Sequence, residues 1–173
     1  MTDKIWQNWE EVINYLQPTL HNRKLFRSSC PNYDGHHDSS QNLNQAAVDI
    51  LVQHNINRIV SFNQVAYNAE EMDRLSKANI IYRHLPVEDF TAATIDQLRL
   101  AIAFVREGSP ANTLIHCGFG WGRSGTGVSA VQMFATWGEL PYDVWKIKGT
   151  NHVEEQVQVD VLKELQTRYK RGA

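Results

Sequence analysis

Short apolar segments with strand character alternate with amphipathic helical segments along most of this chain of 173 residues. The alternation predicts an α/β fold, in which a largely parallel sheet of about four or five strands is covered by helices on both faces. One predicted strand begins at residues 25–26, and three others span residues 57–62, 79–85 and 112–116. The predicted helices span residues 44–54, 69–78, 94–107, 123–137, 142–148 and 154–169.

The length suits one domain with a full hydrophobic core, so residues 1–173 are expected to form a single domain. Its first part, residues 1–23, is expected to be a helical extension packed on the rest. Five apolar residues there share one helical face: Ile5, Trp9, Val12, Ile13 and Leu16. Residues 28–44 are rich in Ser, Asn, Asp, His and Gly, and we interpret them as a long functional loop.

The composition is that of an ordinary globular protein, with a formal net charge of −2. So balanced a charge argues against broad contact with nucleic acid or a membrane surface, and we expect neither as a partner. The first residues are too polar for a signal peptide, no apolar run reaches membrane-spanning length, and the two cysteines make no disulfide framework. We therefore expect a protein of the reducing cytoplasm, and a monomer.

The segment TLIHCGFGWGRSGTG, which begins at Thr113, combines an apolar strand, a glycine-rich loop and the start of a helix. Gly118, Gly120 and Gly122 alternate in the loop, and glycine permits the backbone angles that point successive N–H groups inward. Such a nest binds an anion, and the positive end of the helix that begins near Arg123 adds to it. Because ligands bind beyond the carboxyl ends of the strands in such sheets, the segment predicts a phosphate-binding site there.

Cys117 lies at the centre of this positive field, which favours the thiolate, the nucleophilic form of cysteine. Arg123 follows six positions later, so the loop can bring its guanidinium fork back over a bound phosphate. Ser124 can donate a hydrogen bond to the cysteine sulfur. A buried structural cysteine beside a tight turn, or the cysteine loop of a rhodanese-type sulfurtransferase, explains fewer of these residues.

The run from His116 to Ser124 resembles the signature of the protein tyrosine phosphatases, in which His and Cys are followed by five residues, Arg, and Ser or Thr. Among these enzymes the chain is most similar to the small dual-specificity phosphatases, whose phosphate-binding loop connects a strand to a helix. The resemblance implies that Cys117 takes the phosphoryl group as a phosphocysteine that water hydrolyses, and that Arg123 binds the phosphate. It also implies that His116 orients the loop and supports the thiolate. The five intervening residues would then bind substrate: Gly118, Phe119, Gly120, Trp121 and Gly122.

Breaking a phosphate ester requires a proton on the leaving oxygen, and a carboxylic acid can supply it. In the family that this chain resembles, an aspartate on a loop after an earlier strand has this role. Asp89 in HLPVEDF matches it, 28 positions before Cys117, while Glu88 is the rival and Asp96 belongs to the next helix. A helix cap is the alternative role for Asp89. The loop lacks the Trp-Pro-Asp of the large tyrosine-specific enzymes, and has Ala93 where small enzymes often have proline.

Two further stretches resemble segments of the family. LFRSSCPNY resembles the loop after the first strand of small phosphatases, although an ordinary polar surface loop explains it equally well. The resemblance would place four residues beside the pocket: Arg27, Ser28, Asn32 and Tyr33. VEEQVQVDVL resembles the helix after the water-positioning loop, with Gln156 matching a glutamine of that helix. His152 then takes the place of the residue that orients water, or is a loop histidine without a catalytic role.

Four residues of the long loop are of metal-binding type: Asp34, His36, His37 and Asp38. Their spacing fits no strong ligand pattern, and we interpret them as solvated loop residues. Cys30 can form a redox disulfide with Cys117 only if their loops meet. Phe119 and Trp121 are unusually bulky for such a loop, and either pack outward or form the rim of the substrate pocket.

The resemblance implies that residues 1–173 form one dual-specificity-like catalytic domain. Its substrates would be phosphotyrosine and phosphoserine or phosphothreonine in proteins, and it would need no metal or other cofactor. The chain is much shorter than a tyrosine-specific catalytic domain, which favours a shallow pocket. The first alternative is the same chemistry on an inositol phosphate, a phosphoinositide or an RNA 5′ phosphate, which the absence of lysine from the loop disfavours. The second is a phosphopeptide-binding module without turnover, and the retained Cys, Arg and Asp argue against it.

Overall fold

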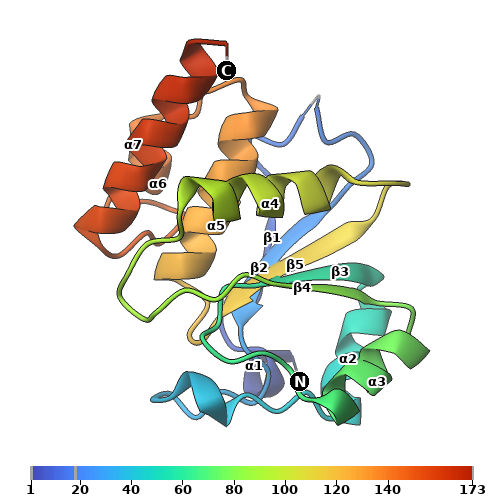
Figure 1. The fold of residues 1–173 in the computed structure, drawn as a ribbon. Helices are drawn as coiled ribbons and strands as arrows, with labels where there is room; N and C mark the ends of the chain where they lie inside the picture. Colours follow the sequence, from blue (N-terminus) through green and yellow to red (C-terminus); the bar gives the residue numbers. More distant parts are fainter. Residues whose placement is uncertain (1, 18, 173) are drawn as a thin grey trace.

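A five-stranded sheet runs through the middle of the computed structural model, which describes residues 2–17 and 19–172 (Figure 1). Its strands lie in the order β1-β2-β5-β3-β4. They are β1 (Glu10–Val12), β2 (Leu25–Ser29), β3 (Ile56–Ser61), β4 (Ile81–His84) and β5 (Asn112–Cys117). The edge strand β1 is antiparallel to β2, and the other neighbouring strands are parallel. The predicted α/β fold with a mostly parallel sheet is confirmed.

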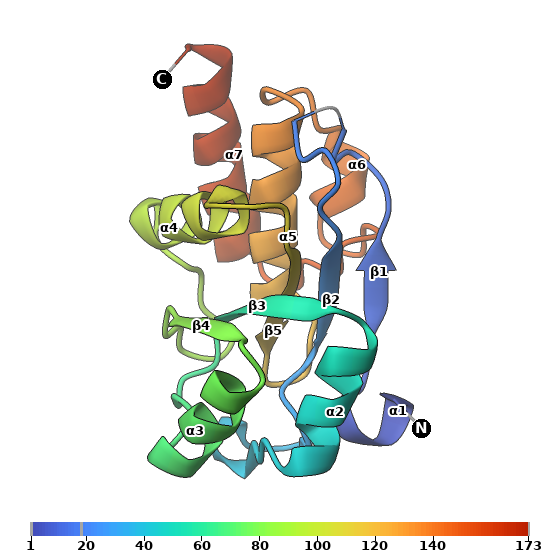
Figure 2. The same ribbon diagram turned by 90° about the vertical axis from the view of Figure 1, so that its right-hand side faces the viewer.

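Helices cover both faces of this sheet (Figures 1 and 2). One face carries α2 (Gln45–Gln53) and α3 (Ala69–Lys77). The other face carries α4 (Ile95–Arg106), α5 (Gly122–Ala135) and α7 (Gln156–Lys170). Two short helices, α1 (Thr2–Ile5) and α6 (Tyr142–Trp145), and the single 3₁₀ turn η1 (Asp38–Ser40) complete the described elements. Capping boxes begin α3 and α4, where Asn68 and Thr94 accept hydrogen bonds from backbone N–H groups of the first turn.

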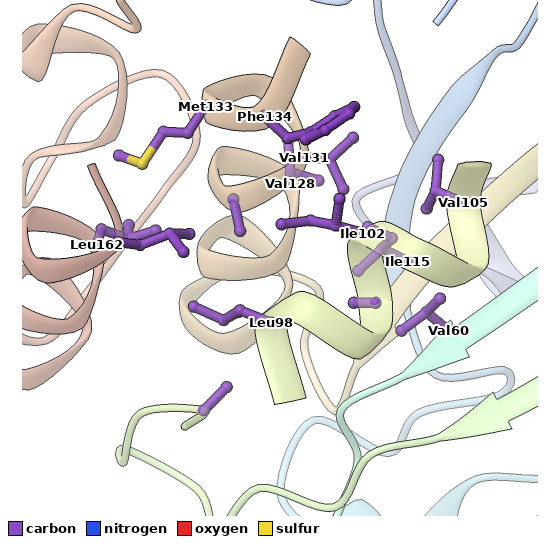
Figure 3. Close-up of a cluster of buried hydrophobic side chains, with 14 of the residues drawn as sticks. Val60, Leu98, Ile102, Val105, Ile115, Val128, Val131, Met133, Phe134 and Leu162 are labelled. Atoms are coloured by element: carbon purple, nitrogen blue, oxygen red, sulfur yellow. The ribbon is translucent and has the colours of Figure 1, made fainter. Parts of the chain in front are cut away.

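The hydrophobic core is divided between the two faces because successive side chains of a strand point to opposite sides. On β5, Leu114 belongs to the cluster under α2 and α3, together with Leu51. Ile115 belongs to the cluster under α4, α5 and α7, together with Leu98 and Leu162 (Figure 3). The central strand β5 is therefore held on both sides, which fixes the position of the loop that follows it.

The N-terminal segment does not form the predicted helix. The helix α1 ends at Ile5, and the chain then forms the edge strand β1. Asn8 and Tyr15 have φ angles of 54° and 58°, so the backbone turns before and after this strand and cannot continue as a helix. Ile13, which the prediction placed on the buried face, is 75% exposed. The prediction of one apolar helical face in this segment is wrong.

Three loops meet at the carboxyl edge of the parallel strands, which is where such sheets bind ligands. The β2–α2 loop reaches the β5–α5 loop, where the Cys30 N–H donates to the Gly118 carbonyl over 2.9 Å. The β4–α4 loop reaches the same place, where Arg123 donates to the Val87 carbonyl over 3.0 Å. None of the helices in the described part of the chain is long and apolar enough to cross a membrane.

Candidate active site

The phosphate-binding loop joins β5 directly to α5, so that Cys117 ends the strand and Gly122 begins the helix. The loop curls around the cysteine sulfur, and the Gly120 N–H donates to Sγ over 3.3 Å. Gly120 has a φ of 95°, and a Cβ there would lie 2.4 Å from the carbonyl carbon of Ser28. Both the backbone conformation and the available space therefore require glycine at this position. A backbone N–H aimed at the sulfur stabilises negative charge on it.

Arg123 extends over the loop from the first turn of α5, with only 3% of its side chain exposed. Its guanidinium forms a bidentate pair with Asp38, in which Nη1 lies 2.6 Å from Oδ2 and Nη2 lies 3.0 Å from Oδ1. Burial alone would lower the pKa of this guanidinium, but the hydrogen bonds to Asp38 and the nearby negative charges raise it above its usual value. Arg123 is therefore a permanent cation held in one orientation.

Asp38 is the residue that fixes this orientation, and the sequence did not predict it. Its carboxylate is buried, accepts a hydrogen bond from the Gln64 N–H over 2.9 Å, and lies so close to the loop that a Cβ on Gly118 would be 2.2 Å from Oδ1. The interpretation of Asp38 as a solvated residue is wrong, because η1 folds back over Arg123. The other three candidate ligands are exposed: Asp34, His36 and His37. Within the described part of the chain, no group of three or more His, Cys, Asp or Glu side chains is arranged to hold a metal ion.

Asp89 enters the site from the β4–α4 loop, as its position in the sequence predicts. Its Oδ1 lies 2.8 Å from Nη2 of Arg123, and 44% of its side chain is exposed. It lines the same pocket as Cys117. Glu88 and Asp96 are both exposed, and Asp96 lies in the first turn of α4. The structure thus places Asp89 in the site, and its role as the acid stays a prediction.

The β4–α4 loop is held over the pocket by side chains from two helices. Arg123 of α5 contacts this loop twice, through the Val87 carbonyl and the Asp89 carboxylate. Gln158 of α7 donates through Nε2 to the Thr91 carbonyl over 2.9 Å, and is only 1% exposed. A loop fixed at both sides of its acid holds that acid in place before substrate arrives.

His116 directly precedes the nucleophile, Ser124 lies in the first turn of α5, and both are fully buried. The His116 ring places Nε2 3.0 Å from the Tyr67 hydroxyl and Nδ1 3.4 Å from the Cys117 carbonyl oxygen. Burial lowers the pKa of His116 to about 4, so the ring is neutral near pH 7 and adds no positive charge for the thiolate. The orienting role of His116 stays a prediction. The Ser124 hydroxyl has no hydrogen-bond partner among the described residues, so the predicted bond to the sulfur is not formed.

A pocket of about 190 Å³ opens above Cys117 and Arg123. Seven further residues line it: Tyr33, Gly35, Asp89, Phe90, Phe119, Glu154 and Gln158. Phe119 lies edge-on to Tyr33, with 6.3 Å between the ring centroids, and these rings with Phe90 form an aromatic rim. Glu154 adds a second carboxyl group to the pocket, and burial, together with the charge of Asp89, raises its pKa.

Of the four residues predicted to flank the pocket from the β2–α2 segment, Tyr33 lines it. Arg27 is directed away from the pocket and pairs with Glu10 of β1. Ser28 is buried in β2, where its hydroxyl donates to the next carbonyl, and the Asn32 side chain donates within its own loop. The predictions for these three residues are wrong, because the pleat of β2 and the path of the loop turn their side chains elsewhere.

The helix α7 contributes to the pocket through different residues from those predicted. Gln156 is exposed and donates to a neighbouring carboxylate, whereas Gln158, two positions later, is buried in the pocket. His152 lies outside this pocket and stacks on Trp121 of the phosphate-binding loop, with ring centroids 4.7 Å apart and an angle of 11° between the rings. The Gln158 side chain accepts from the Glu155 N–H, as in a capping box that begins a helix. A glutamine three positions after Glu155, near the predicted start of a helix, was therefore the one sequence signal that could have singled out Gln158.

The loops of Cys30 and Cys117 do meet, since the Cys30 N–H is bonded to the carbonyl of Gly118, the residue after Cys117. Both thiols are buried and free. Burial raises the pKa of the Cys30 thiol, so it is protonated near pH 7. A redox disulfide between Cys30 and Cys117 requires that their loops meet, and they do. The disulfide itself stays a prediction.

Several solved phosphatase structures are similar to this chain. It is 27% identical to a mutant form of Tk-PTP, with a TM-score of 0.60 over 86% of this chain and 92% of that chain. It is 18% identical to PTPMT1 in complex with PI(5)P, with a TM-score of 0.63 over 86% and 94% of the two chains. It is 12% identical to the core catalytic domain of the PP-IP phosphatase SIW14 from S. cerevisiae, in complex with citrate, with a TM-score of 0.60 over 92% and 93%. The last two likenesses concern the fold, and no curated protein matches the sequence.

The fold, the cysteine loop between β5 and α5, and these likenesses define a cysteine-based phosphatase of the protein tyrosine and dual-specificity superfamily, as predicted. Residues 36–136, more than half of the chain, match the family Tc-R-P, described as polymorphic toxin system, DSP-PTPase phosphatase. The chain belongs to this family. The matched range contains Asp38, Asp89, Cys117 and Arg123, and it ends before α7.

Proposed function

We propose that this phosphatase removes phosphate from phosphotyrosine, phosphoserine and phosphothreonine in proteins, through a phosphocysteine on Cys117. One observation carries the proposal. A cysteine sulfur that accepts a backbone N–H, a fixed guanidinium and a carboxyl group line one pocket of about 190 Å³. A nucleophile, a phosphate-binding cation and a proton donor are the three groups that hydrolysis through a covalent intermediate requires.

In the first step the Cys117 thiolate attacks phosphorus, and the bond between phosphorus and the ester oxygen breaks. Protonated Asp89 gives its proton to that oxygen, so that an alcohol or a phenol leaves and phosphocysteine remains. Arg123 and the loop amides bind the phosphoryl oxygens, whose negative charge they stabilise in the transition state. The phosphoryl group displaces Asp89 from Nη2 of Arg123, and frees that carboxyl group to face the leaving oxygen.

In the second step a water molecule attacks the phosphorus of phosphocysteine. Asp89, now ionised, takes a proton from this water, and the sulfur leaves as a thiolate. Inorganic phosphate and the original enzyme result. The Ser124 hydroxyl, buried near the start of α5 and unbonded among the described residues, is available to donate to the leaving sulfur.

The charges around the pocket support a protein substrate. Arg123 is the single basic side chain among the described residues that line it, and it is already paired with Asp38 and Asp89. Glu154 adds a further carboxyl group at the pocket. A single phosphate on a peptide needs only Arg123 and the loop amides. A ligand with several phosphates would place the others beside Glu154, with no second cation among the described lining residues to bind them, which disfavours inositol polyphosphates and phosphoinositides.

The test is turnover of an aryl phosphate, of phosphopeptides with each of the three phosphoresidues, and of an inositol phosphate and a phosphoinositide, with Cys117→Ser as the control. We expect hydrolysis of the aryl phosphate and the phosphopeptides, inhibition by vanadate, no loss with EDTA, and no turnover by the variant. Faster turnover of the inositol phosphate or the phosphoinositide would refute the protein substrate. Turnover by Cys117→Ser would refute the mechanism.

A further inference from the structure

A second groove adjoins the catalytic pocket on the side of α7. It has a volume of about 500 Å³, and its lining includes Trp121, Ile147, Lys148, Val153, Glu154 and Glu155. Glu154 lines both this groove and the catalytic pocket, so the two are neighbours on the surface. We call this second cavity the side groove. A substrate residue close to the phosphoresidue can reach it while the phosphate occupies the catalytic pocket.

One part of the side-groove wall is apolar and packed against its neighbours. Trp121 is fixed between two neighbours: it stacks on His152 at 4.7 Å and meets Phe119 edge-on, with 4.9 Å between the ring centroids. Val153 is 1% exposed and Ile147 is 39% exposed, so the groove has a buried base and an open apolar edge. Surfaces of this kind bind the aliphatic part of a side chain.

The charges of the side groove are mainly negative. Glu154 and Glu155 line it, against the single cation Lys148. His152 also lines it, but burial lowers the pKa of this ring, which favours its neutral form. Lysine and arginine side chains combine an aliphatic stem with a charged end, and so match an apolar wall that leads to carboxylates. An acidic side chain or a second phosphate would meet like charge there.

We propose that the side groove binds a lysine or arginine side chain that flanks the phosphoresidue, so that the substrates of this enzyme are phosphoproteins with a basic residue beside the phosphoresidue. The inference rests on the proposed function and names the class of protein that it acts on. Phe119 and Trp121 would then contact different residues of the substrate. Phe119 is part of the rim around the phosphoresidue, and Trp121 forms a wall of the groove for its basic neighbour.

The experiment compares phosphopeptides that are identical except for one residue beside the phosphoresidue, which is lysine, alanine or glutamate. We expect kcat/KM to be about tenfold higher for the lysine peptide than for the glutamate peptide, from a few-fold attraction and a few-fold repulsion. Glu155→Lys should bring this ratio close to one. Lys148→Glu should raise it, and since Lys148 is exposed, this second variant tests the charge without disturbing the core.

Asp73→Lys is the matched control, because it makes the same change of charge as Glu155→Lys on α3, across the sheet. It should change neither the ratio nor the turnover of an aryl phosphate. A wild-type ratio of one, a preference for the glutamate peptide, or a ratio that neither groove variant moves would overturn the inference, while turnover of the peptides would still support the proposed function. Failure of the wild type to hydrolyse any phosphopeptide would overturn both.

Discussion

Replacing Asp38 with alanine should be among the most damaging single changes in this protein. Only 6% of the Asp38 side chain is exposed, and it makes two hydrogen bonds to Arg123, whose own side chain is 3% exposed. Removing one partner of a buried ion pair costs about 3–5 kcal/mol, because the other charge stays buried without compensation. Asp89 and the Val87 carbonyl still contact Arg123. We therefore expect the free energy of unfolding to fall by about 3 kcal/mol, the lower end of this range.

Denaturation in urea measures this loss directly, since a fall of about 3 kcal/mol is a large part of the roughly 5–15 kcal/mol that stabilises a typical domain. Asp34→Ala is the matched control, because it removes a carboxylate from the same loop, where 43% of the side chain is exposed. It should cost much less than Asp38→Ala, because the Asp34 carboxylate is exposed and accepts hydrogen bonds only from its own loop.

Asp38→Ala should also lower catalysis, because Arg123 loses the partner that fixes the orientation of its guanidinium. A displacement of a substrate-binding group by about 1 Å can cost on the order of a hundredfold in rate, and we expect kcat/KM of Asp38→Ala to fall by about that factor. The role given to Asp38 would be refuted if the free energy of unfolding of Asp38→Ala lay within about 1 kcal/mol of the wild-type value and its kcat/KM within about threefold.

Three further predictions concern the groups around the cysteine. Asp89→Asn should slow hydrolysis of alkyl phosphates by about a hundredfold or more and of nitrophenyl phosphate far less, since only poor leaving groups need the proton; equal losses on both would exclude Asp89 as the acid. Gln158→Leu frees the acid loop at Thr91, and steady-state kinetics should show a larger fall of kcat on alkyl than on aryl phosphates, whereas an equal fall would mean that Gln158 only stabilises the fold. The pKa of His116 is lowered from 6.5 to about 4 on folding, so between these values the unfolded chain binds more protons and stability falls as the pH falls, by roughly 3 kcal/mol in total. His116→Gln should flatten this pH dependence in denaturation experiments, and an unchanged slope would show that another group causes it.

Much of the fold follows from local sequence patterns. The strands and helices from residue 25 onward were predicted within a few residues, because each has a short apolar run or a helical period of its own. The apolar residues of the first segment also match a helical period, but β1 forms because β2 offers a free edge for antiparallel pairing. Pairing with a distant strand leaves no periodic signal in so short a segment, so the sequence alone did not reveal it.

The site was predictable where its residues are close in the sequence. Cys117 and Arg123 lie at the two ends of one loop whose glycines and spacing are visible in the sequence, and Asp89 follows a recognisable strand. Asp38 and Gln158 act through the folding of distant segments over that loop, and both have polar side chains that are common on any surface. Their burial, which distinguishes them from other polar residues, is a property of the packed structure.

We predict that phosphate passes through the sulfur of Cys117. Rapid acid quenching of the enzyme during turnover of an aryl phosphate, followed by peptide mass spectrometry, tests it most directly. We predict a peptide that contains Cys117 and carries one additional phosphoryl group on sulfur, and that Asp89→Asn accumulates more of it if hydrolysis of the intermediate becomes slower than its formation. Phosphate on another residue, or continued turnover by Cys117→Ser without any phosphoenzyme, would contradict this mechanism.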